Sequence, residues 1–125
     1  MQASRDLLMG YPVYVKALEF YDAVMDDTGR KLPDERWMVV VNQVVRSAGS
    51  ISANIEEGYG RGTSKEFAYR LRIARGEAYE SKGWYRRSQH FLPAGLIQQR
   101  QQQAGELIAL LSSMIRTLER KSTSE

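Results

Sequence analysis

The chain has no cysteine and only one histidine, His90, among its 125 residues. Disulfides, thiol nucleophiles and thiolate metal sites are therefore excluded, and one histidine cannot form a histidine metal cluster or dyad. These absences remove the residues that most enzyme classes use. We expect a non-catalytic protein with no catalytic residue, no metal and no cofactor.

Long hydrophobic runs are also missing. The apolar run from Trp37 to Val41 is as long as any in the chain, whereas a helix that spans a bilayer needs about 20 apolar residues. Residues 1–10 lack the apolar core and the small-residue cleavage site of a secretory signal. Together with the absence of cysteine, these features predict a cytoplasmic protein with no membrane partner.

The composition, 42% hydrophobic and 26% charged, is that of an ordinary globular protein. The length is close to the commonest domain size, so we expect one domain over residues 1–125. Apolar residues recur along the chain at the spacing of amphipathic helices. The pattern predicts four helices, at about residues 12–27, 33–58, 63–91 and 94–121.

Local signals mark the ends of these helices. Pro33 suits the first turn of the second helix, and Thr63 with Glu66 forms a capping box for the third. Gly29 and Gly58 suit the C-terminal caps of the first and second helices. Four amphipathic segments joined by short connections favour an all-α fold, an antiparallel up-and-down four-helix bundle.

Each predicted helix carries an apolar stripe, and the first carries an arc wide enough for two packing partners. The stripes define the expected core. Its members are Val13, Tyr14, Ala17, Leu18, Phe20, Tyr21, Val24 and Met25, then Trp37, Val41, Val44, Ala48, Ile51 and Ile55, then Phe67, Leu71, Ala74, Ala78, Ser81 and Tyr85, and finally Leu96, Leu107, Leu110, Leu111, Met114 and Leu118.

The formal net charge of +3 hides an asymmetry. Residues 1–60 hold six basic and nine acidic residues, a net charge of −3, whereas residues 61–125 hold twelve basic and six acidic residues, a net charge of +6. The third predicted helix concentrates the positive charge on one face, because its basic residues follow helical spacing. That face carries Arg72, Arg75, Tyr79, Lys82 and Arg86 within about 80°, and Arg61, Lys65 and Arg87 are close in sequence.

These eight residues form the candidate nucleic-acid-binding site. Arginine side chains bind phosphate oxygens and a tyrosine ring stacks on an unpaired base, so RNA or DNA would fit this face. The alternatives are a solvated helix face or salt bridges between subunits, since the net charge is small for a dedicated nucleic-acid binder. The sequence does not distinguish RNA from DNA.

Two other motifs are weaker indications of a ligand site or a metal site. The stretch from Gly58 to Thr63 is similar to a glycine-rich phosphate loop, but it lacks the Gly-Lys-Ser/Thr ending and follows a helix. We interpret it as a turn, beside which an anion could bind the N–H groups at the start of the third helix. Glu77 and Glu80 lie one turn apart, as in carboxylate metal sites, but no Glu-x-x-His motif accompanies them.

Residues 46–67, with the sequence RSAGSISANIEEGYGRGTSKEF, resemble the bacterial four-helix-bundle family named after proteins encoded in ribosomal-RNA intervening sequences. The similarity is most specific over about residues 46–80. Two residues depart from the family pattern. Glu56 stands where the family usually has alanine, and Glu77 stands where it usually has serine.

The resemblance also implies a structural polar motif. Its positions in this chain are Arg46, Asn54, Glu57, Arg61 and Glu80. Arg46 and Glu80 are expected to form a buried, hydrogen-bonded pair. The Asn54 side chain is expected to satisfy backbone groups near the turn.

The same superfamily includes the accessory variability proteins of diversity-generating retroelements. That relationship implies a homopentameric ring or barrel with a basic surface, and a reverse transcriptase as a partner. The apolar arc of the first helix and the small residues Gly49, Ser50 and Ala53 would then be subunit contacts. The hypothesis is a non-catalytic nucleic-acid-binding accessory protein, and the alternative is an oligomeric protein-binding scaffold with no nucleic-acid role.

Overall fold

The computed structural model describes residues 7–124. Residues 1–6 and 125 lie outside this description, and with them much of the segment in which we predicted no secretory signal, as well as both ends of the predicted domain. Within residues 7–124 the structure is all-helical, without strands. Its long helices are α2 (Pro12–Thr28), α3 (Arg36–Tyr59), α4 (Ser64–Arg87) and α5 (Ala94–Ser124), and a 3-10 turn, η1 (Ser88–His90), follows α4.

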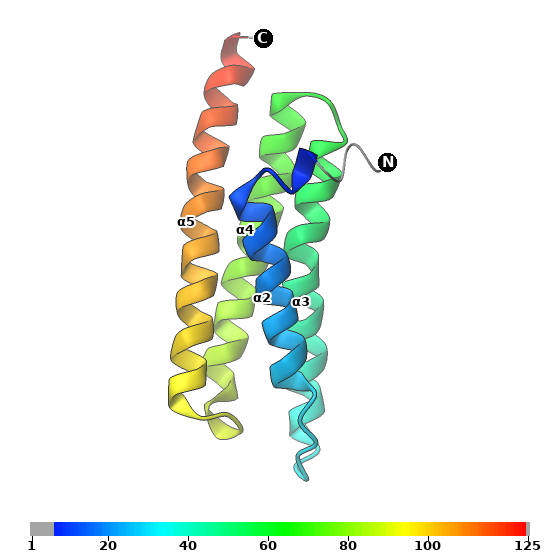
Figure 1. Ribbon diagram of the computed structural model, residues 1–125, viewed down its shortest axis with the longest axis vertical. Coiled ribbons are helices and arrows are strands. Elements are labelled where there is room, and N and C mark those ends of the chain that lie inside the picture. Colours follow the sequence, from blue (N-terminus) through cyan, green and yellow to red (C-terminus); the bar gives the residue numbers. More distant parts are fainter. Residues whose placement is uncertain (1–6, 125) are drawn as a thin grey trace.

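The helices run alternately up and down, as Figure 1 shows, which is the arrangement of a four-helix bundle. α4 packs along both α3 and α5, and α2 lies over the groove between α3 and α5. None of the helices between residues 7 and 124 combines the length and the hydropathy needed to cross a membrane. The start of α2, the turn between α3 and α4, and the C-terminal part of α5 lie at the same end of the bundle.

Capping explains where the helices begin. The prediction for Thr63 is confirmed: its backbone is extended, and its hydroxyl accepts the backbone N–H of Glu66 at 3.2 Å. The prediction for Pro33 is wrong, because α3 begins at Arg36. Asp34 accepts the backbone N–H of Arg36 at 3.0 Å, so this carboxylate rather than the proline marks the start of the helix.

Of the two predicted glycine caps, Gly29 is confirmed in position and Gly58 is wrong. Gly29 is the C-cap of α2 and its backbone N–H donates to the Met25 carbonyl, but its φ of −70° is right-handed and not the left-handed conformation typical of a glycine cap. α3 continues through Gly58 and ends at Tyr59, because Gly58 is needed where α3 and α4 approach each other: a Cβ there would lie 2.8 Å from the Arg70 Cβ and from the Phe67 ring. The left-handed residue is Gly62, at φ +92°, which turns the chain into α4.

The buried core follows the predicted stripes. At the edges of the stripes, some predicted residues are half-buried or exposed, and other residues are buried instead. All six expected positions of α4 are buried. In α3, Val40 is buried and Val41 is only half-buried. In α5, the buried residues include Ile97 and Ile115, which the stripe omitted, whereas Leu96, Leu110 and Met114 are half-buried. In α2, Leu18 and Tyr21 are half-buried and Met25 is exposed.

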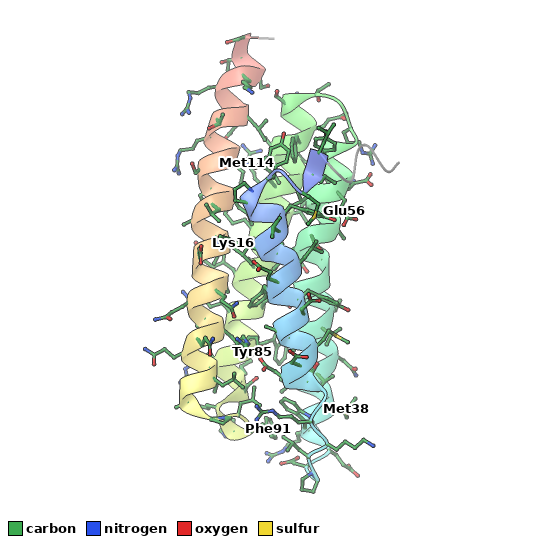
Figure 2. The ribbon with its side chains drawn as sticks, viewed as in Figure 1. Lys16, Met38, Glu56, Tyr85, Phe91 and Met114 are labelled. Atoms are coloured by element: carbon green, nitrogen blue, oxygen red, sulfur yellow. The ribbon has the colours of Figure 1, made fainter. Side chains whose placement is uncertain are left out.

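α2 is attached to its neighbours by polar contacts as well as by its apolar arc. The Tyr14 hydroxyl donates to Glu56 of α3 at 2.7 Å, which gives the unusual Glu56 a partner. Lys16 forms a 2.7 Å salt bridge with Glu106 of α5, which raises the pKa of Lys16 (Figure 2). The arc predicted to contact other subunits is therefore used largely within the chain.

The small-residue face of α3 is used within the chain in the same way. A Cβ at Gly49 would lie 3.2 Å from the Tyr21 ring of α2, so Gly49 permits that contact. Ser50 is half-buried, and its hydroxyl accepts the Asn54 amide at 3.0 Å. Only Ala53 of the three small residues is exposed.

A buried charged cluster joins three helices at the other end of the bundle. Asp27 of α2 is only 3% exposed, although it lies at the predicted end of the first helix. Its carboxylate accepts the Tyr85 hydroxyl at 2.7 Å and the Arg100 Nε at 2.8 Å. Burial and the bond to Asp27 raise the pKa of Tyr85, and the same carboxylate raises the pKa of Arg100.

Two glycine substitutions should have opposite effects on stability. Gly58→Ala adds a Cβ at the close contact between α3 and α4, and overpacking of this kind costs about 1–3 kcal/mol. Gly76→Ala adds a Cβ to an exposed helical position with open space around it, so we expect a gain of about 1 kcal/mol from helix propensity. Urea denaturation measures both. A gain of stability from Gly58→Ala would contradict the close packing.

Removal of the Tyr85 hydroxyl should destabilise the protein in a pH-dependent way. Tyr85→Phe removes a hydrogen bond to a buried carboxylate, with an expected loss of about 1–3 kcal/mol at neutral pH. The raised pKa of Tyr85 stabilises the folded state below the ordinary tyrosine pKa of about 10, and this contribution is lost as the pH rises above it. The difference between wild type and Tyr85→Phe in urea denaturation should therefore shrink above pH 10. Tyr69→Phe, at an exposed tyrosine, is the matched control.

Candidate nucleic-acid interface

The predicted basic face lies on α4, along its seam with α5. Arg72, Tyr79, Lys82 and Arg86 are exposed, and Arg75 is half-buried. Helical spacing therefore places these five side chains on one side of α4, as predicted, because α4 is continuous from Ser64 to Arg87.

Two of the arginines on this face are held by α5. Arg72 forms a salt bridge with Glu119, and the Arg75 guanidinium donates to the Ser112 hydroxyl at 3.1 Å. The Arg72 side chain is still 45% exposed. These contacts mean that the face is not a row of free cations, since part of its charge is compensated by α5.

The C-terminal part of the face, from Lys82 onward, carries positive charge that no salt bridge between residues 7 and 124 compensates. Lys82 and Arg86 form no salt bridge with any residue between 7 and 124. The Arg87 guanidinium lies 4.8 Å from the centre of the Trp84 ring, a cation–π contact that leaves its charge in place. Gly83 permits this arrangement, because a Cβ there would lie 2.9 Å from the Arg87 guanidinium.

The N-terminal part of the face, around Arg72, borders a basic groove between α4 and α5 with a volume of about 350 Å³. Lys65 and Arg72 line it from α4, and Glu119, Ser122 and Thr123 line it from α5. The sequence predicted a fourth helix that ends at about residue 121, so the prediction missed Ser122 and Thr123, which lie in α5 and line this groove. Arg116 and Arg120, four residues apart and therefore on one side of a continuing helix, are the sequence signal that α5 is basic near its end.

Arg61 does not join the α4 face. It pairs with Glu57, one turn earlier, and lines a separate hollow with Tyr69 and Arg70. Arg70 points toward α3, where its guanidinium donates to Asn54 at 3.5 Å. Of the eight predicted contact residues, Arg61 is thus the one that the structure places elsewhere.

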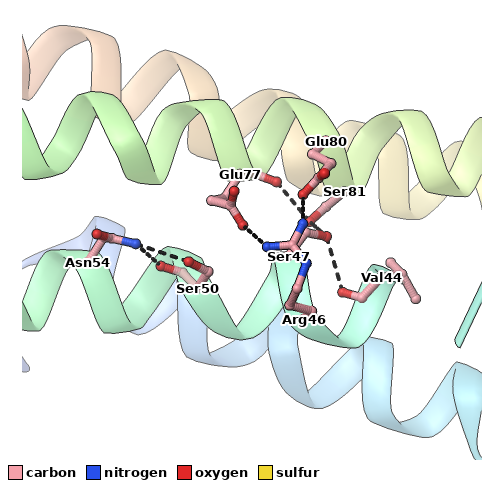
Figure 3. Close-up of polar contacts among 8 residues, drawn as sticks. All are labelled: Val44, Arg46, Ser47, Ser50, Asn54, Glu77, Glu80 and Ser81. Atoms are coloured by element: carbon pink, nitrogen blue, oxygen red, sulfur yellow. Dashed lines mark hydrogen bonds and ion pairs between the residues drawn. The ribbon is translucent and has the colours of Figure 1, made fainter. Parts of the chain in front are cut away.

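Figure 3 shows Arg46, Asn54 and Glu80 of the polar motif, between α3 and α4. Arg46 binds Glu80, as the resemblance implied, and also binds Glu77, with 3.1 Å between the Arg46 Nη1 and the Glu77 carboxylate. The predicted burial is wrong, because the Arg46 side chain is 52% exposed and lies at the rim of the bundle. The two carboxylates raise the pKa of Arg46. Glu77, which departs from the family pattern, gives the arginine its second partner.

Buried hydroxyls lie beneath this motif. The hydroxyls of Ser47 and Ser81 are hydrogen-bonded to each other at 2.8 Å between α3 and α4 (Figure 3). The Asn54 amide satisfies a backbone group, as predicted, but not one near the turn, because it donates to the Ser50 carbonyl at 2.8 Å, one helical turn back. Side chains four residues apart in a helix are neighbours, which explains this local partner.

Among residues 7–124, no group of three or more histidine, aspartate or glutamate side chains could hold a metal ion. Glu77 and Glu80, the carboxylates with metal-site spacing, both bind Arg46. Their negative charge is therefore compensated by a guanidinium.

The chain is similar to known proteins in both sequence and fold. The model of the family described as 23S rRNA-intervening sequence protein matches residues 10–118. The chain is similar to a solved structure from Bacteroides thetaiotaomicron, described as a protein with unknown function from the S23 ribosomal protein family, with 27% sequence identity and a TM-score of 0.76. The match covers 82% of this chain and 97% of that chain. No curated protein matches the chain.

Proposed function

Because the chain belongs to the 23S rRNA-intervening sequence protein family, and because α4 carries an exposed basic face, we propose that it is a non-catalytic accessory protein that binds nucleic acid. One observation carries the proposal. Lys82 and Arg86 present uncompensated positive charge on the same side of α4 as the exposed Tyr79 ring, and the exposed Arg87 follows them with its guanidinium over Trp84. Phosphates would bind the cations, and the ring would stack on an unpaired base.

The distribution of acidic residues supports the same proposal. Glu19, Asp22 and Asp26 are exposed on α2, which lies over the groove between α3 and α5 and not against the basic face of α4. The negative charge of the first half of the chain therefore leaves the field around α4 positive. Such a field attracts a phosphate backbone and weakens as salt is added.

Salt titration of oligonucleotide binding tests the proposal. Lys82→Ala and Arg86→Ala should each reduce the slope of log affinity against log salt by about 0.7 for a single strand, or about 0.9 for duplex DNA, for each lost phosphate contact. Lys31→Ala, which removes an exposed cation between α2 and α3, is the matched control and should leave the slope unchanged. No binding at low salt, or an equal effect of Lys31→Ala, would contradict the proposal.

A variant that removes a negative charge next to the basic face should have the opposite effect on affinity. Glu119→Gln removes the carboxylate that holds Arg72 and should increase affinity for the strand, whereas Arg72→Gln should decrease it. The salt bridge is exposed, so both substitutions should change the free energy of unfolding by less than about 1 kcal/mol. Both substitutions should therefore change the affinity while leaving the stability nearly unchanged.

We further propose that the chain forms a homo-oligomer, with the pentameric ring implied by the resemblance as the specific expectation. Met25, Met38 and Val39 support an assembly interface because their apolar side chains are between 46% and 57% exposed on α2 and α3. Met38 lies near the lower end of α3 in Figure 2. A reverse transcriptase as partner stays a prediction that rests on the resemblance alone.

Val39→Lys should lower the oligomeric state, because it places a charge in the exposed apolar patch. Sedimentation velocity over a range of protein concentrations measures this effect. Gln102→Lys, which adds the same charge to an exposed position of α5, is the control. A wild-type protein that stays monomeric at all concentrations would contradict the ring, and a protein partner captured after nuclease treatment would favour the scaffold alternative.

A further inference from the structure

A second hollow lies at the end of the bundle where α3 passes into α4. Its volume is about 160 Å³, and its lining includes Tyr11, Tyr59, Phe67 and Leu118. It is separate from the groove between α4 and α5, which has a different set of lining residues. The sequence singled out this turn as similar to a phosphate loop, and neither the basic face nor the core accounts for the hollow.

Three aromatic rings surround this hollow, and each pair meets edge to face. The ring centres of Tyr11 and Tyr59 are 6.0 Å apart, those of Tyr59 and Phe67 are 6.2 Å apart, and those of Tyr11 and Phe67 are 6.3 Å apart. The angles between the ring planes are 71°, 79° and 82°, so no ring is stacked flat on another. A planar group that enters can stack on one ring while its edge meets a second.

Glycine keeps this corner of the bundle open. Gly58 brings α3 against Phe67 of α4, which places the next residue, Tyr59, beside that ring. Gly62 lines the hollow with no atom within 4 Å of where a Cβ would be. Tyr11 and Tyr59 are half-buried, so their rings are held in place and still reached by solvent.

The aromatic hollow and the basic groove are lined by residues that are neighbours in the sequences of α4 and α5. Phe67 and Leu118 line the hollow, and their sequence neighbours Ala68 and Glu119 line the groove. The groove supplies the cations of Lys65 and Arg72, the second of which Glu119 holds in a salt bridge, and the Ser122 hydroxyl as a hydrogen-bond donor. The Thr123 hydroxyl already donates to the Arg120 carbonyl at 2.8 Å. A site for a planar ring and a site for a phosphate are therefore adjacent across the first turns of α4.

We infer that the hollow formed by Tyr11, Tyr59 and Phe67 binds one unpaired base of a single-stranded nucleic acid whose phosphates lie in the basic groove. The inference rests on the proposed function and names its ligand more closely. A base inside a duplex is already stacked and paired, so it cannot enter the hollow without being extruded. The protein should therefore bind a single strand more tightly than a duplex of the same sequence.

Fluorescence anisotropy with two labelled oligonucleotides tests the inference. One is a single strand of pyrimidines, and the other is an abasic strand with the same number of phosphates. Stacking of one base on an aromatic side chain corresponds to about 5- to 150-fold in affinity, so the strand with bases should bind more tightly by at least about fivefold. Tyr59→Leu should lower the affinity for the strand with bases toward that of the abasic strand, leaving at most the preference that Tyr79 contributes, and should leave the abasic affinity unchanged.

Matched variants separate the hollow from the rest of the interface. Tyr79→Leu removes an exposed ring from the basic face and should keep a difference between the two strands. Tyr11 lies outside the turn between α3 and α4, and Tyr11→Leu should reproduce the effect of Tyr59→Leu. The agreement of the two variants would show that the effect is not a local folding defect of the turn. Urea denaturation of each variant shows that it is folded.

The outcomes distinguish the inference from the proposed function. Equal affinity of the wild type for the two strands would overturn the base site and leave the proposed function standing. Loss of the difference in Tyr79→Leu alone would place the base on α4 and also overturn it. No binding of either strand at low salt would overturn the proposed function, and the base site with it.

Discussion

Burial of the α4 stripe between α3 and α5 is the constraint on which the other features depend. The stripe from Phe67 to Tyr85 is buried along its length, so α4 has one core-facing side, two flanks and one outer side. The flank toward α3 carries Glu77 and Glu80, and the flank toward α5 carries Arg72 and Arg75. What each side chain can bind is therefore decided by which flank it occupies.

Periodicity was enough to predict the helices and the sides of α4, because both depend on residues close in sequence. The Thr63 cap was predictable for the same reason. Contacts between distant residues were not: the spacing shows that Arg72 lies on one face, but not that Glu119 stands opposite. The burial of Asp27 was not predictable either, because nothing near it in sequence indicates Tyr85 or Arg100.

The glycines illustrate the same limit. A glycine at the end of an apolar stripe favours a helix cap, and that local interpretation was applied to Gly58. Its actual role depends on Phe67 and Arg70 of the next helix, which approach too closely for a side chain at this position. The net charge likewise understated the basic face, because some arginines are compensated within the chain and others, such as Arg86, are not.

The cluster around Asp27 has a consequence for how the chain folds. α3, α4 and α5 pack against their neighbours in sequence, so their contacts form without closing long loops. Asp27 must instead find partners 58 and 73 residues away. We expect α3 to α5 to assemble first and α2 to dock late, with desolvation of the Asp27 carboxylate as the slow closing step. The folding transition state would then contain little of α2, and changes in α2 would alter the unfolding rate more than the folding rate.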